Sequence, residues 1–231
     1  MSGREIRATW DAAAASDRVD EFVGDPATAR AELEGLFGRL GADPRGGTCL
    51  DVGCGPGRMT AVLAERFDSV VAVDVSAGML ERARAAVTSP NVDFRLVEGD
   101  RLDSVEDGIA NALVCYLVLQ HLPERRVVLR YLGEFARVLS PEGSAFVQLP
   151  LLQSGLRPWA WRLARTVAVP LSGLFRRGVT DNAAYRGTRL TEGELQNGLA
   201  AAGLRTAARD ESPDSPYRYA REVFLRLERV A

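Results

Sequence analysis

The stretch that decides the fold is 48-TCLDVGCGPG-57, an apolar run that closes on three glycines spaced as G-x-G-x-G. Residues 48–53 have the composition of a buried strand, and residues 57–67 continue as a helix. A glycine-rich turn between a strand and a helix lets a ligand approach the backbone closely, and it directs free helix N–H groups toward that ligand. The stretch therefore predicts a ligand site, with a tight turn that binds nothing as the alternative.

Strands and helices alternate on the carboxyl-terminal side of this turn. This rhythm predicts a parallel sheet with helices on both faces. The expected strands are 69–74, 92–97, 110–117 and 144–149, and the expected helices are 76–87 and 123–139, with a turn at 141–143. Two further helices, 4–23 and 26–40, are expected ahead of the turn, with Asp25 capping the second.

The carboxyl-terminal part has a different pattern. Residues 191–202 indicate a helix opened by a Thr191…Glu194 capping box and ended by Gly203. Strand-like stretches follow at 204–210 and 217–227. We therefore expect an α/β fold built on a doubly wound, mostly parallel seven-stranded sheet with an antiparallel C-terminal hairpin strand.

A length of 231 residues suits a single domain. Within it we expect an N-terminal helical cap (1–44), a cofactor-binding core (45–150), a helical lid insertion (151–187) and a C-terminal helix and hairpin (188–231). The insertion mixes tryptophan with arginine. It can form a lid over an apolar pocket, pack against the sheet edge, or lie on a membrane surface as an amphipathic helix.

Composition excludes several classes of function. The net charge of −2 does not favour nucleic-acid binding, which needs a basic excess. The three cysteines form no C-x-x-C pair, so neither a disulfide framework nor a metal site is expected. We see no signal peptide and no run of about 18 apolar residues. The expectation is a cytoplasmic monomer or homodimer that acts on a small molecule.

Acidic residues follow the next two strands at positions that suit a nucleoside. Asp74 ends the strand after the glycine turn, about 20 residues further on, where a carboxylate can accept hydrogen bonds from both ribose hydroxyls. Gly99 and Asp100 follow the third strand and are placed to reach an adenine edge. Each acid has an ordinary alternative, Asp74 as a helix cap and Asp100 as a loop acid. Three such features at the ends of consecutive strands favour a nucleoside site.

These segments resemble the motifs of class I (Rossmann-like) S-adenosylmethionine-dependent methyltransferases. The stretch 50-LDVGCGPG-57 is similar to their first motif, 71-VAVDVS-76 to their second and 97-VEGD-100 to their third. Residues 113–123 and 138–143 resemble the fourth-strand segment and the turn before the fifth strand. The resemblance covers about residues 48–150, with weaker agreement at 188–227.

The resemblance implies a binding role for each matching residue. Gly53, Cys54, Gly55 and Gly57 would line the methionine part of the cofactor, with Asp51 near its ammonium group. Asp74 would hold the ribose. Met79 would pack on adenine, and Asp100 would accept from its amino group, with Arg101 and Leu102 flanking the ring. The expected set is completed by Arg58, Val75, Gly99 and Trp10, the last on a helix that covers the cofactor.

The function that the resemblance implies is transfer of a methyl group from S-adenosylmethionine to an oxygen or nitrogen of a small molecule, and the reaction is expected in secondary metabolism. S-adenosylhomocysteine would be the other product. Two alternatives stay open, a non-catalytic S-adenosylmethionine-binding protein and an NAD(P)-dependent oxidoreductase. The second fits less well, because its G-x-G-x-x-G spacing is not met when Arg58 follows the last glycine.

The candidate catalytic residues are His121 and Tyr116, which follow the fourth strand at the expected crevice. A histidine can remove a proton near neutrality, so His121 is a candidate general base. The alternative is that it orients the helix that follows. Tyr116 would border the acceptor or belong to the core.

Overall fold

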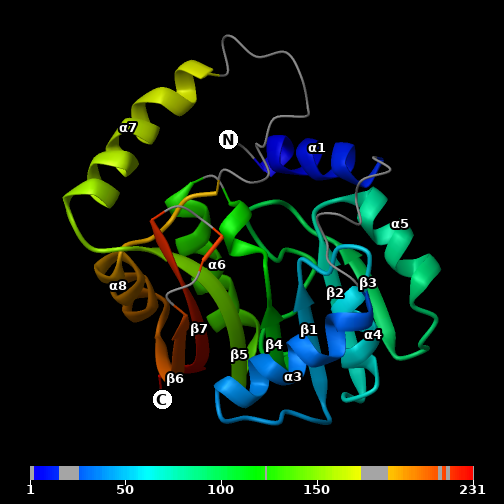
Figure 1. Cartoon of the computed structure of the whole chain (residues 1–231). Coiled ribbons are helices and arrows are strands. Elements are labelled where there is room, and N and C mark those ends of the chain that lie inside the picture. Colours follow the sequence, from blue (N-terminus) through cyan, green and yellow to red (C-terminus); the bar gives the residue numbers. More distant parts are fainter. Residues whose placement is uncertain are drawn as a thin grey trace.

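The computed structural model describes residues 3–15, 26–122, 124–172, 187–212, 215–216 and 219–230. They form one seven-stranded sheet in the order β3-β2-β1-β4-β5-β7-β6. Strands β1 to β5 are parallel, and β7 lies antiparallel between β5 and β6, so the predicted fold class is confirmed (Figure 1). The strands are β1 (Thr48–Val52), β2 (Ser69–Asp74), β3 (Val92–Leu96), β4 (Ala110–Cys115), β5 (Leu139–Leu152), β6 (Leu204–Ser212) and β7 (Ala220–Arg229).

Helices cover both faces of the sheet. The helices are α1 (Gly3–Ala14), α3 (Ala29–Arg39), α4 (Arg58–Ala64), α5 (Ala77–Ala86), α6 (Arg125–Val138), α7 (Leu156–Ser172) and α8 (Glu192–Ala202), with short 3-10 helices η1 (Pro26–Thr28) and η2 (Leu119–His121). Because side chains alternate along a strand, Leu50 packs in the core beneath α6, whereas Cys49 packs in the core beneath α3 and α4. Helix α1 lies across the top of the sheet in Figure 1, where β1, β2 and β4 end.

The carboxyl-terminal unit follows the sequence pattern closely. The Thr191 hydroxyl accepts from the Glu194 N–H, and the Glu194 carboxylate accepts from the Thr191 N–H, which completes the capping box. Gly203 ends the helix with a φ of 69°. Local hydrogen-bond chemistry therefore places both ends of α8.

Two expected elements differ from the structure. Helix α1 ends at Ala14, and the expected continuation to residue 23 lies outside the described residues, as does Asp25. The expected turn at 141–143 is part of β5, as a bulge whose pairing with β4 steps from Leu139 to Ser144. At Gly143 a Cβ would lie 2.5 Å from the Ala110 carbonyl oxygen, so the absence of a side chain permits this close backbone approach.

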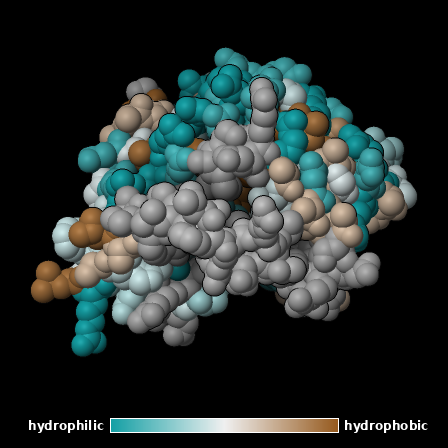
Figure 2. Space-filling view, turned by 90° about the horizontal axis from the view of Figure 1, so that it is seen from above, coloured by the Kyte–Doolittle hydropathy of each residue, from teal (hydrophilic) through white to brown (hydrophobic). Residues whose placement is uncertain are grey.

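The segment expected to form a lid begins as strand and continues as α7, a helix that projects from the body (Figure 1). Leu156, Trp159 and Leu163 share one side of α7 and are 85%, 59% and 51% exposed. Figure 2 shows apolar atoms standing out at the edge of the molecule on the side of α7. Inward, Trp161 packs against the guanidinium of Arg189, 4.4 Å from its ring centre. No helix among the described residues is long and apolar enough to cross a membrane.

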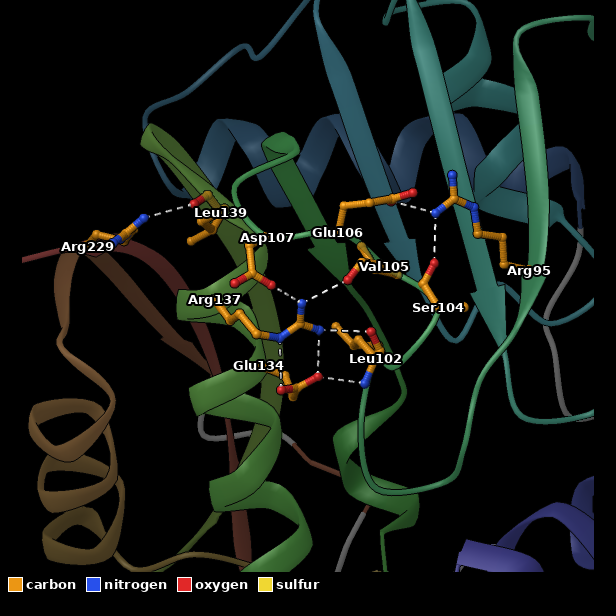
Figure 3. A network of polar contacts seen from close by, with 10 residues as sticks. All are labelled: Arg95, Leu102, Ser104, Val105, Glu106, Asp107, Glu134, Arg137, Leu139 and Arg229. Atoms are coloured by element: carbon orange, nitrogen blue, oxygen red, sulfur yellow. Dashed lines mark hydrogen bonds and ion pairs between the residues drawn. The ribbon is translucent and has the colours of Figure 1, made fainter.

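Arg137 ties the loop between β3 and β4 to helix α6 (Figure 3). Its Nη1 donates to the Val105 carbonyl and Nη2 to the Leu102 carbonyl, both at 2.8 Å. The Glu134 carboxylate receives hydrogen bonds from Arg137 and from the Leu102 N–H. The Arg137 hydrogen bonds hold the pKa of Glu134 below its usual range. Side chains on α6 thereby satisfy loop backbone groups that strand pairing leaves open.

We predict that Arg137→Met lowers the free energy of unfolding by about 2–3 kcal/mol, because it leaves two carbonyls without a donor and removes the ion pair of Glu134. Arg126→Met on the same helix is the control, since the Arg126 side chain is 71% exposed. It should change stability by no more than about 0.5 kcal/mol. Urea unfolding of both variants measures the difference, and equal midpoints would show that the network contributes nothing.

Candidate active site

A cleft opens where β1, β2 and β4 end, beneath α1. Its empty volume is about 1010 Å³, including the part that is open to solvent. Most of the residues expected to contact the cofactor or acceptor line this cleft: Trp10, Asp51, Gly53, Cys54, Gly55, Arg58, Asp74, Val75, Met79, Tyr116 and His121. The fold therefore brings together residues from four separate segments of the chain.

The backbone of the glycine turn is hydrogen-bonded to β2. The N–H groups of Gly53 and Cys54 both donate to the Val73 carbonyl, at 2.8 and 3.0 Å. Gly53 has a φ of 72°, and a Cβ there would lie 2.5 Å from a methyl group of Val118. Conformation and space both require glycine at this position. The turn leaves backbone, rather than side chains, at the floor of the cleft.

The carboxylate of Asp74 is buried at the end of β2 and is held by backbone. Its Oδ2 accepts from the Gly55 N–H and its Oδ1 from the Ser76 N–H, both at 2.9 Å. Burial raises the pKa of Asp74. Each carboxylate oxygen can accept a second hydrogen bond, so the pair fits the two hydroxyls of a ribose.

Asp51 is the second buried acid of the cleft. Its Oδ2 accepts from the Thr60 hydroxyl at 2.7 Å. Burial raises the pKa of Asp51 to about 6. A cation bound beside this carboxylate would offset the cost of burying its charge, so Asp51 fits the ammonium group of an amino acid.

Helix α1 is hydrogen-bonded to the cofactor side of the cleft. The Ser76 hydroxyl donates to Asp11 at 2.6 Å and accepts from the Met79 N–H at 3.2 Å. The Trp10 ring meets the His121 ring edge-on, with 5.2 Å between the ring centres. Trp10 therefore links the helix that covers the cleft to His121 of η2.

Arg58 lines the cleft, but its charge is already paired. Its two terminal nitrogens donate to the two carboxylate oxygens of Glu32, at 2.9 and 3.0 Å. Such a bidentate pair fixes the guanidinium. The burial of Cys54 raises the pKa of its thiol well above the usual range, so Cys54 contributes a neutral surface.

Five expected cofactor contacts do not line the cleft: Gly57, Gly99, Asp100, Arg101 and Leu102. A Cβ on Gly57 would lie 2.8 Å from Val87, which follows α5, and 3.3 Å from Ala83 of α5, so this glycine serves helix packing. Asp100 forms ion pairs with Arg130 and Arg101. Leu102 is fully buried in the core, with its N–H bonded to Glu134, and so has no surface to offer an adenine ring.

Several cleft residues were not expected from the sequence. They are mostly apolar and come from strands or helices whose patterns indicated core: Ile6, Val52, Met59, Val73, Val97, Leu117, Val118, Leu122 and Tyr131. Leu117 stands out because its φ of 60° lies in the left-handed region, which costs energy for a leucine. No pattern of spacing reveals these positions, since apolar residues that line a cleft and those that fill a core look alike in sequence.

The part of the cleft that follows β4 is lined by Tyr116, Leu117 and His121. Burial raises the pKa of Tyr116, so its phenol stays protonated near neutral pH. Residues 187–188 lie against η2 here, and the Thr188 N–H donates to the Leu122 carbonyl at 2.7 Å. Within the described parts of the chain, no cluster of histidine, cysteine or acidic residues could hold a metal ion.

Comparison with known proteins agrees with this geometry. Residues 50–147 match the methyltransferase domain family. The chain is 35% identical over 133 residues to a trans-aconitate 2-methyltransferase of Azoarcus sp. (strain BH72), covering 53% of this chain and 50% of that protein. It is 30% identical over 138 residues to a ubiquinone biosynthesis O-methyltransferase of Xanthomonas oryzae, covering 59% and 55%. The chain thus spans about half the length of the curated relatives it matches.

The fold is shared with solved structures at lower identity. Magnesium protoporphyrin IX methyltransferase from Synechocystis PCC 6803, solved with bound S-adenosylhomocysteine, superposes with a TM-score of 0.64 at 18% identity, covering 98% of this chain and 99% of that one. Geranyl diphosphate C-methyltransferase from Streptomyces coelicolor gives 0.64 at 16% identity, covering 99% and 97%.

The strand order, the glycine turn and the paired acids define a Rossmann-like fold with a nucleoside cleft. Residues 50–147, which carry the glycine turn and both acids, match the methyltransferase domain family, and the fold is shared with S-adenosylmethionine-dependent methyltransferases of known structure.

We predict that affinity for S-adenosylmethionine rises about tenfold as the pH increases from about 5 to 7, and then levels off. Below pH 6 the Asp51 carboxyl is neutral, because its pKa is raised to about 6, and it attracts the ammonium group less. Calorimetric titrations across this range measure the effect. Asp51→Asn should bind more weakly at neutral pH and lose this dependence, whereas Asp93→Asn, an exposed acid on β3, should keep it. A flat profile in the parent protein would remove Asp51 from the ammonium site.

Proposed function

We propose that this chain transfers a methyl group from S-adenosylmethionine to a small-molecule acceptor, on an oxygen or a nitrogen atom. The single observation that carries the proposal is the placement of two buried carboxylates, Asp74 and Asp51, around the glycine turn in one cleft. We favour an oxygen atom as the methyl acceptor, since one relative is named a ubiquinone biosynthesis O-methyltransferase. We place the reaction in secondary metabolism, as the sequence suggested.

The residues of the cleft would divide between the two ends of the cofactor. Asp74 would accept from the ribose hydroxyls and Asp51 from the ammonium group. Met79, buried beside the start of α5, would pack on the adenine ring. These contacts hold the cofactor by groups that do not react, which is how binding energy is used to position a reacting atom.

When bound, the cofactor supplies an electrophilic methyl group on a sulfonium, which the lone pair of an acceptor displaces in line. The protein's task is to place that lone pair and to exclude water. Trp10, on a helix fixed through Asp11 and Ser76, closes one side of the cleft. Tyr116 and His121 border the side from which an acceptor would approach.

The second candidate function is binding of the cofactor without catalysis, because the same cofactor contacts would support it. Nothing in the glycine turn or at Asp74 departs from the motif that the resemblance is built on. The oxidoreductase alternative has no support from the family match, which is to a methyltransferase domain.

We expect the purified chain to bind S-adenosylmethionine and S-adenosylhomocysteine in calorimetry, and not NADH. Asp74→Ala should lower the affinity by about 100-fold or more, because each of two hydrogen bonds to a charged acceptor contributes about 1.5–3 kcal/mol. Asp100→Ala is the matched control, since Asp100 is paired with Arg130 outside the cleft, and its affinity should stay within about threefold. Unfolding curves establish that both variants are folded. Binding of NADH alone, or equal losses in the two variants, would contradict the assignment.

Catalysis is tested separately by incubating the chain with cell extract and cofactor labelled in the methyl group. Labelled product of low molecular mass supports the proposed reaction. Label recovered only in protein or nucleic acid would contradict a small-molecule acceptor. Cofactor binding without any transfer would favour the non-catalytic alternative.

A further inference from the structure

A chain of buried polar side chains leads away from His121 into the sheet. It runs from η2 through Gln120 to Gln148 on β5 and ends at Glu222 on β7. Gln120, Gln148 and Glu222 are 6%, 2% and 7% exposed, in a part of the sheet that is otherwise apolar. Buried amides need defined partners on both their oxygen and their nitrogen, so the direction of each one matters.

The direction of the Gln148 amide is fixed from two sides. Its Oε1 accepts from the backbone N–H of Leu117 at 3.1 Å, and that N–H can only donate. Its Nε2 donates to the carboxylate of Glu222, which also accepts from the Ser215 hydroxyl. A reversed amide would point its NH₂ at the N–H of Leu117 and its oxygen at the carboxylate. Both contacts would then be repulsive.

The direction of Gln148 fixes that of Gln120. The Nε2 of Gln148 lies 3.2 Å from the Oε1 of Gln120, so the Gln120 oxygen must face it as the acceptor. The NH₂ group of Gln120 then faces the imidazole of His121, where its Nε2 is 3.2 Å from the Nε2 of the ring. Because this NH₂ group can only donate, the ring Nε2 must be the acceptor.

We propose that Glu222 and the Leu117 N–H, acting through Gln148 and Gln120, fix His121 as the tautomer that carries its proton on Nδ1. This is the less populated tautomer of a histidine in water, so the protein would be imposing it. In this state the lone pair of Nε2 is committed to Gln120. Within the proposed function, His121 then orients groups at the acceptor side and does not remove a proton through Nε2. Gln120 and Gln148 are its positioning residues.

The chain contains one histidine, so a single imidazole can be read directly. The experiment is long-range ¹H–¹⁵N correlation spectroscopy on protein labelled with ¹⁵N-histidine and purified without a histidine tag. At a pH of about 8.5 a histidine with the reference pKa of ~6.5 is neutral, so the spectrum distinguishes the two tautomers. We expect a protonated Nδ1 and an unprotonated Nε2. A protonated Nε2 in the parent protein would overturn the proposal.

A pair of substitutions should reverse the direction of these hydrogen bonds without changing the net charge or the size of the side chains. In Gln148→Glu with Glu222→Gln, the new carboxylate still accepts from the Leu117 N–H but cannot donate to Gln120. Gln120 should then turn its NH₂ group toward residue 148 and its oxygen toward His121, which shifts the proton to Nε2. Glu222→Gln alone is the matched control, because the Leu117 N–H still directs Gln148, and it should keep the proton on Nδ1.

Gln120→Leu gives an independent test should the exchanged pair fail to fold. This substitution removes the hydrogen bond next to the His121 ring, so the tautomer preferred in water, with the proton on Nε2, should return. If Gln120→Leu, or a folded exchanged pair, leaves the proton on Nδ1, the proposed chain does not set the tautomer. The spectrum needs no turnover, so a chain that fails to transfer methyl groups still answers this question.

Discussion

The carboxylate of Asp74 is the contact on which the rest of the site depends. It joins the glycine turn after β1 to the start of α5 by accepting from Gly55 on one side and Ser76 on the other. Ser76 in turn holds α1 through its hydrogen bond to Asp11. One buried acid at the end of β2 therefore aligns three segments that are distant in the sequence, and together they form the floor and the cover of the cleft.

The electrostatics of the cleft follow from the same burial. Asp51 and Asp74 both have raised pKa values because the protein removes water from their carboxylates. Their negative charge is costly until a ligand supplies a cation or hydroxyl groups. The cleft is thus prepared for a ligand that carries both, which matches the two ends of S-adenosylmethionine.

The loop after β3 shows how tertiary contacts can redirect side chains that a motif assigns to a ligand. Arg137 and Glu134 of α6 bind the backbone of this loop, and Leu102 is drawn into the core. Asp100 is turned toward Arg130 of the same helix. The third motif therefore keeps its place in the fold, while its acid pairs with an arginine and not with the cleft.

The sequence by itself determined those features that depend on local chemistry. The spacing of Gly53, Gly55 and Gly57 predicted the turn, and the capping box with Gly203 predicted both ends of α8. The position of Asp74 at the end of a strand predicted its place in the cleft. The turn and the helix ends held because they depend on backbone conformation or on partners within a few residues. The prediction for Asp74 held because the carboxyl ends of neighbouring parallel strands meet at one edge of the sheet.

Tertiary structure alone decided the rest. Whether Leu102 is buried, and whether Asp100 faces Arg130, depends on how α6 packs against a loop some 30 residues away in sequence. The contact between Gln148 and Glu222 exists only because β7 inserts antiparallel beside β5, which joins residues 74 positions apart. Through such contacts, the direction of one hydrogen bond determines the direction of the next as far as His121. No local sequence pattern predicts this direction, because strand order, and not sequence spacing, decides which side chains are hydrogen-bonded.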